Sequence, residues 1–183
     1  PDKRIVLYTG QLLPGKGAHV FVDAAQHFGD DVMFLLVGGH GDYLRRMQTH
    51  INENNILNVT VTGFVSPALI PLYQAAADVL VLPATADHDI SAYTSPLKLF
   101  EYMASRRPIV ASDLPVLKEI LEDGENALIF AERNENALAE KIKLLLQDAT
   151  LASQLAERAF VDVQQLTWDE RAKRILDFLR LEE

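Results

Sequence analysis

The run Arg4-Ile5-Val6-Leu7-Tyr8-Thr9 is short and apolar, and Gly10 ends it. Its apolar residues are continuous and do not alternate with polar ones, which predicts a β-strand that is buried on both faces. Similar runs, most of them closed by glycine or proline, recur along the chain at Val32–Val37, Asn58–Thr62, Asp78–Leu82, Pro108–Ala111 and Ala127–Phe130. Working outward from the first run, we therefore expect about six buried strands.

Helical patterns separate these strands. They cover residues 18–27, 43–54, 66–76, 96–105 and 116–121, and three amphipathic segments follow the last strand at residues 135–147, 152–164 and 168–181. Alternating strands and helices predict an α/β fold with a Rossmann-like parallel sheet, helices on both faces and extra C-terminal helices. Residues 1–183 are expected to form a single domain, in which a ligand binds at the carboxyl ends of the strands.

Composition excludes several classes of function. The chain has 183 residues and a net charge of −9, so no basic surplus is present for general nucleic-acid binding. It contains no cysteine, which excludes disulfides and thiolate chemistry and fits a cytoplasmic protein. The sequence has no signal peptide or membrane-length apolar run. Because it begins at Pro1, just ahead of a strand, we expect a piece of a longer chain, and any membrane association would belong to the full-length protein.

Glycines mark three strand ends on the expected binding edge, at Gly10, Gly38 and Gly63. Gly10, Gly15 and Lys16 also match the spacing of the phosphate-binding loop of nucleoside triphosphatases. That loop requires Ser or Thr next to hold magnesium, and this chain has Gly17, so a triphosphatase is disfavoured. A looser interpretation remains, in which the glycines let the backbone approach a ligand and Lys16 lies near a phosphate.

A second candidate site lies in the stretch from Tyr93 to Ala104, Tyr-Thr-Ser-Pro-Leu-Lys-Leu-Phe-Glu-Tyr-Met-Ala, which reads as a loop that enters a helix. Ser95 is a suitable N-cap and Pro96 a suitable first helical residue, so the free N–H groups of this helix start could hold a phosphate. Glu101 could accept hydrogen bonds from sugar hydroxyls. The competing interpretation is a capped core helix with a Lys98–Glu101 surface pair. Asp87-His88-Asp89 contains metal-ligand types, but adjacent residues rarely converge on one ion, so we predict no metal site.

These motifs follow a recognisable order: the Lys16-Gly17 loop, Gly38-Gly39, Thr62-Gly63-Phe64-Val65 and the run from Ser95 to Asp113. In this order the chain resembles the C-terminal, nucleotide-sugar-binding domain of GT-B glycosyltransferases of the group 1 family. The resemblance covers nearly the whole chain, and the run from Ser95 to Asp113 is its most specific part. It implies one half of a GT-B fold and a retaining transfer of a hexose from a nucleotide diphosphate sugar to an acceptor.

The resemblance also implies roles for particular residues. Lys16 would hold the diphosphate with N–H groups from residues 94–97, Glu101 would fix the ribose, and Phe64 and Val65 would border the base. The implied donor-binding set is Gly10, Gln11, Lys16, Gly17, Gly38, Gly63, Phe64, Val65, Thr94, Ser95, Pro96, Leu97 and Glu101. No catalytic residue, metal or cofactor is assigned to this half. Two positions depart from the family pattern: Tyr93 replaces a Glu beside the donor sugar, and Gln11 replaces an Arg or Lys.

The expected partners are a UDP-, GDP- or ADP-sugar and an N-terminal acceptor domain that this chain lacks. The chain alone is therefore expected to bind nucleotide without transferring sugar. Tyr93 and Gln11 leave open a non-catalytic or degenerate nucleotide-sugar-binding module. Another GT-B enzyme, such as a sugar-nucleotide epimerase, is a further alternative. The segment from Trp168 to Leu181 resembles the part of the family that packs back toward the N-terminal domain.

Overall fold

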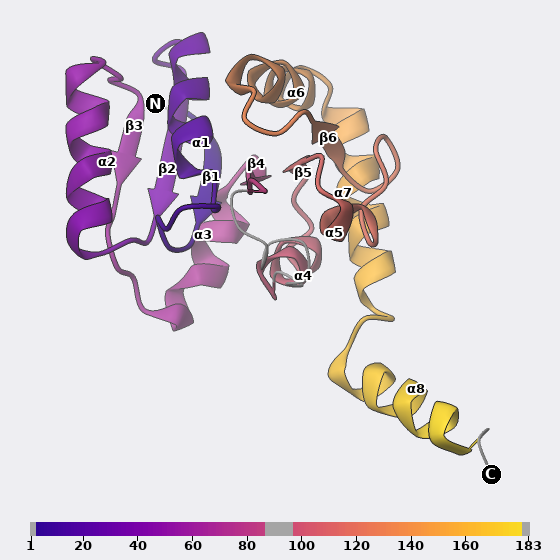
Figure 1. Cartoon of the computed structure of the whole chain (residues 1–183). Helices are drawn as coiled ribbons and strands as arrows, with labels where there is room; N and C mark the ends of the chain where they lie inside the picture. The colour runs from indigo at the N-terminus through magenta and orange to yellow at the C-terminus, as the bar shows by residue number, and fades with distance from the viewer. Residues whose placement is uncertain (1–2, 87–96, 181–183) are drawn as a thin grey trace.

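A computed structural model describes residues 3–86 and 97–180. These residues form a six-stranded sheet in the order β3-β2-β1-β4-β5-β6, with every neighbouring pair parallel (Figure 1). The strands are β1 (Arg4–Thr9), β2 (Val32–Val37), β3 (Val59–Val61), β4 (Val79–Leu82), β5 (Ile109–Ser112) and β6 (Leu128–Phe130). The predicted α/β fold with a parallel sheet of about six strands is thereby confirmed, although β3, at the edge of the sheet, is only partly buried.

Alternate side chains of the strands enter two separate apolar cores, which is why the apolar runs are continuous. In β1, Val6 and Tyr8 pack in the core on one face of the sheet, whereas Leu7 packs in the core on the other face. Leu7 lies in register with Leu35 of β2 and Leu80 of β4. A strand in the middle of a parallel sheet therefore has no polar face, and β1 holds the centre of the structure.

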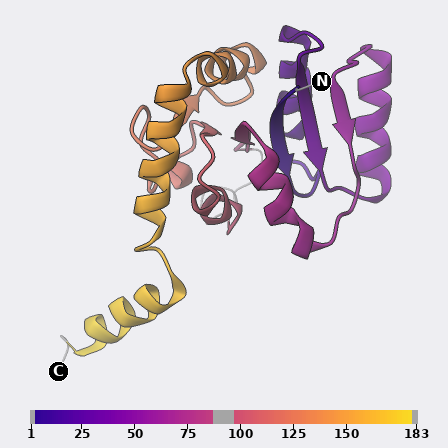
Figure 2. The ribbon, with the colours of Figure 1, turned by 180° about the vertical axis from the view of Figure 1, so that it is seen from behind.

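The helices divide between the two faces of the sheet. They are α1 (Ala18–Ala24), α2 (Gly41–Glu53), α3 (Ile70–Ala76), α4 (Leu97–Ala104), α5 (Pro115–Lys118), α6 (Glu135–Gln147), α7 (Ala149–Val163) and α8 (Trp168–Arg180), with 3₁₀ turns at Ala25–His27 and Pro67–Leu69. Helices α1, α2 and α6 cover one face, and α3, α4 and α5 cover the other. Helix α7 contributes residues to both cores. Figure 2 shows the molecule from the side opposite to that of Figure 1.

Most helix boundaries agree with the sequence prediction to within a few residues. Helix α7 begins at Ala149, three residues earlier than expected, because the Asp148 side chain accepts a hydrogen bond from the Leu151 N–H and caps the helix. The expected helix over 66–76 is split into the 3₁₀ turn and α3. The expected short helix over 116–121 is observed as α5, at Pro115–Lys118.

Helix α8 lies beyond the layered body, at the far end of α7 (Figure 1). Its large apolar side chains are exposed: Trp168, Ile175, Leu176, Phe178 and Leu179. None of the helices described within residues 3–86 and 97–180 is long and apolar enough to cross a membrane. The amphipathic pattern of α8 therefore has an apolar side that residues 3–86 and 97–180 leave exposed.

Candidate functional site

Three strand ends meet at one edge of the sheet, as the glycine pattern predicted. The N–H of Gly10, after β1, donates a hydrogen bond to the carbonyl oxygen of Val37 at 2.8 Å, and Gly38 forms an isolated bridge with Gly63. A Cβ on Gly38 would overlap the Gly10 carbonyl oxygen, and Gly38 has a φ of 120°. Glycine is required here because only a bare backbone allows these loops to approach each other so closely.

The loop after β1 turns sharply into α1 through Gly17, which has a φ of 69°. A Cβ on Gly17 would overlap the carbonyl oxygen of Pro83, at the end of β4. The loop is tied to the same segment by a hydrogen bond from the Thr85 N–H to the Gly15 carbonyl oxygen at 3.0 Å. The geometry therefore has no room for the Ser or Thr that holds magnesium in a triphosphatase loop, while Lys16 remains exposed on the loop.

Helix α4 is attached to the end of β1 by two of its side chains. The Tyr102 hydroxyl accepts a hydrogen bond from the Thr9 N–H at 2.9 Å and lies 3.1 Å from Thr9 Oγ1. Lys98, one turn earlier, places its Nζ 4.3 Å from the centre of the Tyr8 ring. The Tyr8 hydroxyl in turn donates a hydrogen bond to the carbonyl oxygen of Gln11 at 2.7 Å. The helix and the Lys16 loop are thus held together through the last residues of β1.

Lys98 occupies a different environment from the surface pair considered in the sequence. It is partly buried, and it turns toward Tyr8 instead of pairing with Glu101 at the surface. The pKa of Lys98 is lowered to about 7, mainly by burial and in addition by the nearby charge of Lys16, while Glu101 opposes both effects. Sequence spacing contained a signal for this placement, because Lys98 directly precedes Leu99 and lies four residues before Tyr102, both on the buried side of α4.

Glu101 and Leu97 lie on the outer side of α4, and both are exposed. They line a cavity of about 700 Å³ that opens between α4 and the start of α8. Trp168 and Arg171 form its opposite wall. The structure therefore gives Glu101 access to a ligand from the outer side, while Lys98 faces inward on the same helix.

The strand end after β3 presents one aromatic side chain to solvent. Phe64 is 78% exposed, although it is a large hydrophobic residue. Its neighbour Val65 is partly buried and packs against the core under α3 and α4, and Gly63 is buried. An exposed ring on a fixed loop is suited to stacking against a flat group, whereas Val65 contributes mainly to packing.

Part of the expected site lies outside the described residues. Thr94, Ser95 and Pro96, which were expected to start α4 and to offer N–H groups, fall there, as does Tyr93. Asp87-His88-Asp89 falls there too. In the ranges 3–86 and 97–180, no three His, Asp or Glu side chains gather in a way that could hold a metal ion.

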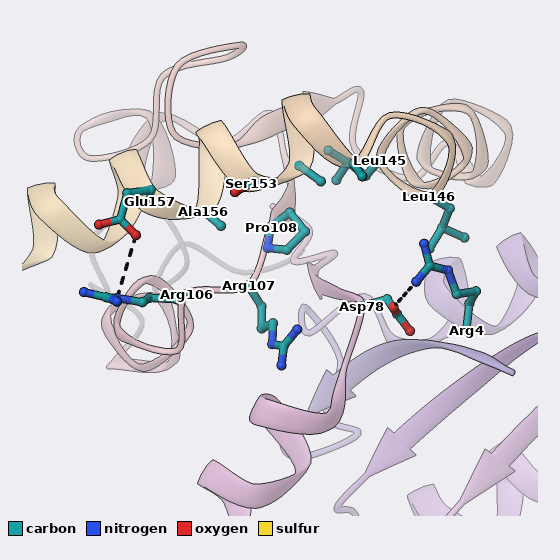
Figure 3. A pocket seen from close by; sticks show the side chains of 12 residues that line it. Arg4, Asp78, Arg106, Arg107, Pro108, Leu145, Leu146, Ser153, Ala156 and Glu157 are labelled. Carbon is teal, nitrogen blue, oxygen red and sulfur yellow. Dashed lines mark hydrogen bonds and ion pairs between the residues drawn. The ribbon is translucent and has the colours of Figure 1, made fainter. Parts of the chain in front are cut away.

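A separate hollow of about 270 Å³ lies at the opposite edge of the sheet, where β1, β4 and β5 begin (Figure 3). It contains three arginines, but each already has a protein partner. Arg4 pairs with Asp78 at 2.7 Å, Arg106 lies 3.8 Å from Glu157, and Arg107 donates a hydrogen bond to a carbonyl oxygen of α3. Because these charges are satisfied within the protein, this hollow is a poor anion site compared with the edge that holds Lys16.

Known proteins resemble this chain over most of its length. The profile of the family described as glycosyl transferases group 1 matches residues 1–162. Alpha-D-kanosaminyltransferase of Streptomyces kanamyceticus is 28% identical over 162 residues, which cover 86% of this chain and 40% of that protein. Phosphatidyl-myo-inositol mannosyltransferase of Mycobacterium leprae is 29% identical over 178 residues, which cover 94% of this chain and 45% of that protein. The chain therefore spans less than half the length of these curated relatives.

Solved structures show the same fold. HepE of Anabaena in complex with UDP superimposes with a TM-score of 0.86 and 24% identity, over 98% of this chain and 49% of that one. The C-terminal domain of a group 1 glycosyl transferase, LpcC of Francisella tularensis, superimposes with a TM-score of 0.74 and 20% identity, over 89% of this chain and 85% of that domain. Together with the family profile, the sheet and its glycine-lined edge lead to one conclusion: the chain belongs to the glycosyl transferases group 1 family and has the fold of the C-terminal half of a GT-B glycosyltransferase.

Proposed function

We propose that this chain is the donor-binding half of a retaining glycosyltransferase, and that it binds a nucleotide diphosphate sugar at the carboxyl edge of its sheet. The observation that carries the proposal is the convergence of Gly10, Gly38 and Gly63 at that edge, beside Lys16 and α4. Bare backbone allows a planar or charged ligand to come close, and a lysine beside it can hold phosphate. HepE, which has this fold, was solved with UDP and with UDP-glucose, which supports the same ligand class here.

Within this proposal, each exposed residue of the edge contacts a different part of the nucleotide. Lys16 contacts the diphosphate, Phe64 stacks against the base, and Glu101 accepts hydrogen bonds from the ribose hydroxyls. Lysine stabilises the charge that develops on the leaving diphosphate, so the side chains can perform the role of a metal ion. Transfer to an acceptor further requires the half of the protein that the roughly twofold longer relatives possess. The chain alone is thus proposed to bind nucleotide without transferring sugar.

Calorimetric titration of the 183-residue chain with UDP, GDP and ADP tests this function. One diphosphate should bind, and Lys16→Ala and Glu101→Ala should each weaken it by about 1.5–3 kcal/mol, the usual loss for a charge-assisted hydrogen bond. Matched controls are Lys3→Ala, just ahead of β1, and Glu140→Ala on α6, which remove exposed charges far from the edge. Equal weakening by the controls, or no binding of any of the three diphosphates, would refute the proposal.

One observation favours a second candidate, a non-catalytic module that binds nucleotide sugar. Gln11 is exposed and uncharged at the position where the family pattern carries a cation. Product analysis of a full-length protein separates the two functions, because the module produces neither a hexosyl product nor an epimerised donor. Recovery of transfer activity by Tyr93→Glu would favour the degenerate module.

A further inference from the structure

The ammonium group of Lys98 lies at the same edge as Lys16 and points inward. Its Nζ lies over the ring of Tyr8, 4.3 Å from the ring centre, beside the backbone of Gly10. A Cβ on Gly10 would overlap this Nζ, so the ammonium lies directly against the bare backbone at the end of β1. Attraction between a cation and an aromatic face is sufficient to aim the lysine along this path.

Lys98 forms no ion pair with a carboxylate within residues 3–86 and 97–180. Lys98 lies over the Tyr8 ring, and the charges that act on it are those of Lys16 and of Glu101, one turn along α4. Burial raises the pKa of Tyr8 and of Tyr102, which stay neutral. Glu101 favours the charged form of Lys98, but it is exposed and lines the α4–α8 cavity. Lys98 is therefore partly buried and feels the positive charge of the exposed Lys16, an arrangement that an anion between the two lysines would stabilise.

We propose that Lys98 holds the donor diphosphate together with Lys16, and that it supplies from α4 the positive charge that Gln11 lacks in the loop. This inference rests on the proposed function, because it assigns a second cation to the same nucleotide site. A cation at residue 11 would belong to the loop after β1, whereas Lys98 reaches the end of β1 from α4. The diphosphate then lies between two lysines from separate elements.

Proton uptake on binding is the signature of this arrangement. In the free protein the pKa of Lys98 is about 7, so at pH 8 most of the ammonium groups have lost their proton. A diphosphate within contact distance favours the charged form, so binding at pH 8 should take up close to one proton. Calorimetry in two buffers with different ionisation enthalpies measures that uptake directly.

The test compares the wild type with Lys98→Met and Lys98→Arg, using UDP, GDP and ADP and the corresponding nucleosides. Lys98→Met should weaken the diphosphate about 10- to 100-fold and leave nucleoside binding unchanged. Lys98→Arg should keep most of the affinity but lose the proton uptake, because arginine stays charged. Lys173→Met, an exposed substitution on α8, is the control, and thermal unfolding of each variant confirms that it is folded.

The outcomes distinguish this inference from the function on which it rests. If the wild type binds a diphosphate and Lys98→Met binds it equally well, Lys98 is not a phosphate ligand and the proposed function stands. If Lys98→Met weakens the nucleoside and the diphosphate alike, its effect is on the fold of the site, and the inference is overturned. If the wild type binds none of the diphosphates, both proposals fail together.

Discussion

Replacing Lys98 by Met should stabilise the folded chain, although it damages the proposed site. Unfolding raises the pKa of this lysine from about 7 to the ordinary 10.5. Between these pH values the unfolded state binds more protons than the folded state, so the free energy of unfolding of the wild type rises with pH. The destabilisation caused by burying Lys98 is therefore greatest in acid. Each pKa unit corresponds to about 1.36 kcal/mol, so Lys98 lowers the free energy of unfolding at pH 7 by at most about 4 kcal/mol. The loss at pH 7 is smaller than in acid because Lys98 is already neutral in about half of the folded molecules.

The assay is thermal unfolding of the wild type and Lys98→Met at pH 7, 8 and 9, with Lys173→Met as the control. Over this range the wild type should gain roughly 1 kcal/mol per pH unit relative to Lys98→Met, or about 2–4 °C in Tm for a chain of this size. Lys173→Met, which changes an exposed residue, should follow the wild type. Parallel curves for the wild type and Lys98→Met would show that Lys98 carries no such penalty. A confirmed penalty would fit a charge that is kept for function at the expense of stability.

Three further substitutions test the geometry of the edge. Gly17→Ser should lower stability by at least about 2 kcal/mol in urea unfolding, because its Cβ would overlap the Pro83 carbonyl; an unchanged midpoint would contradict this. Tyr102→Phe should cost about 1–3 kcal/mol by leaving the buried Thr9 N–H without its acceptor, whereas equal stability would exclude that role. Phe64→Ala should weaken the bound diphosphate by about 1–3 kcal/mol in calorimetry with Tm unchanged, since the ring is 78% exposed; full affinity would exclude stacking.

The apolar runs, and the glycines and prolines that end most of them, predict most of the fold of this chain. Continuous apolar runs such as Arg4–Thr9 and Val32–Val37 predict strands buried on both faces, and both agree with the structure residue for residue. The start of α7 is harder to predict from the sequence, because it depends on one hydrogen bond from the Leu151 N–H to the Asp148 side chain. The glycine-marked strand ends were placed on one edge by the rule that parallel strands share a direction.

The arrangement of charge at that edge could not be derived in the same way. One of the two competing interpretations of the sequence paired Lys98 with Glu101 on the surface, because residues three apart are neighbours on a helix. The actual direction of Lys98 depends on how α4 is rotated against β1, which the Tyr102–Thr9 hydrogen bonds and the room left by Gly10 determine. The contact between Gly17 and Pro83 likewise joins residues that are far apart in the chain.

The sequence by itself therefore determined the order of strands and helices along the chain, the parallel sheet and the edge where the glycine-marked strand ends meet, because these follow from local periodicity and chain direction. Only the tertiary structure decided that Lys98 faces Tyr8 while Glu101 faces outward on the same helix. The physical reason is that side-chain direction and desolvation arise from packing between distant elements. Burial of that kind is also what lowers the pKa of Lys98 and distinguishes it from an ordinary surface lysine.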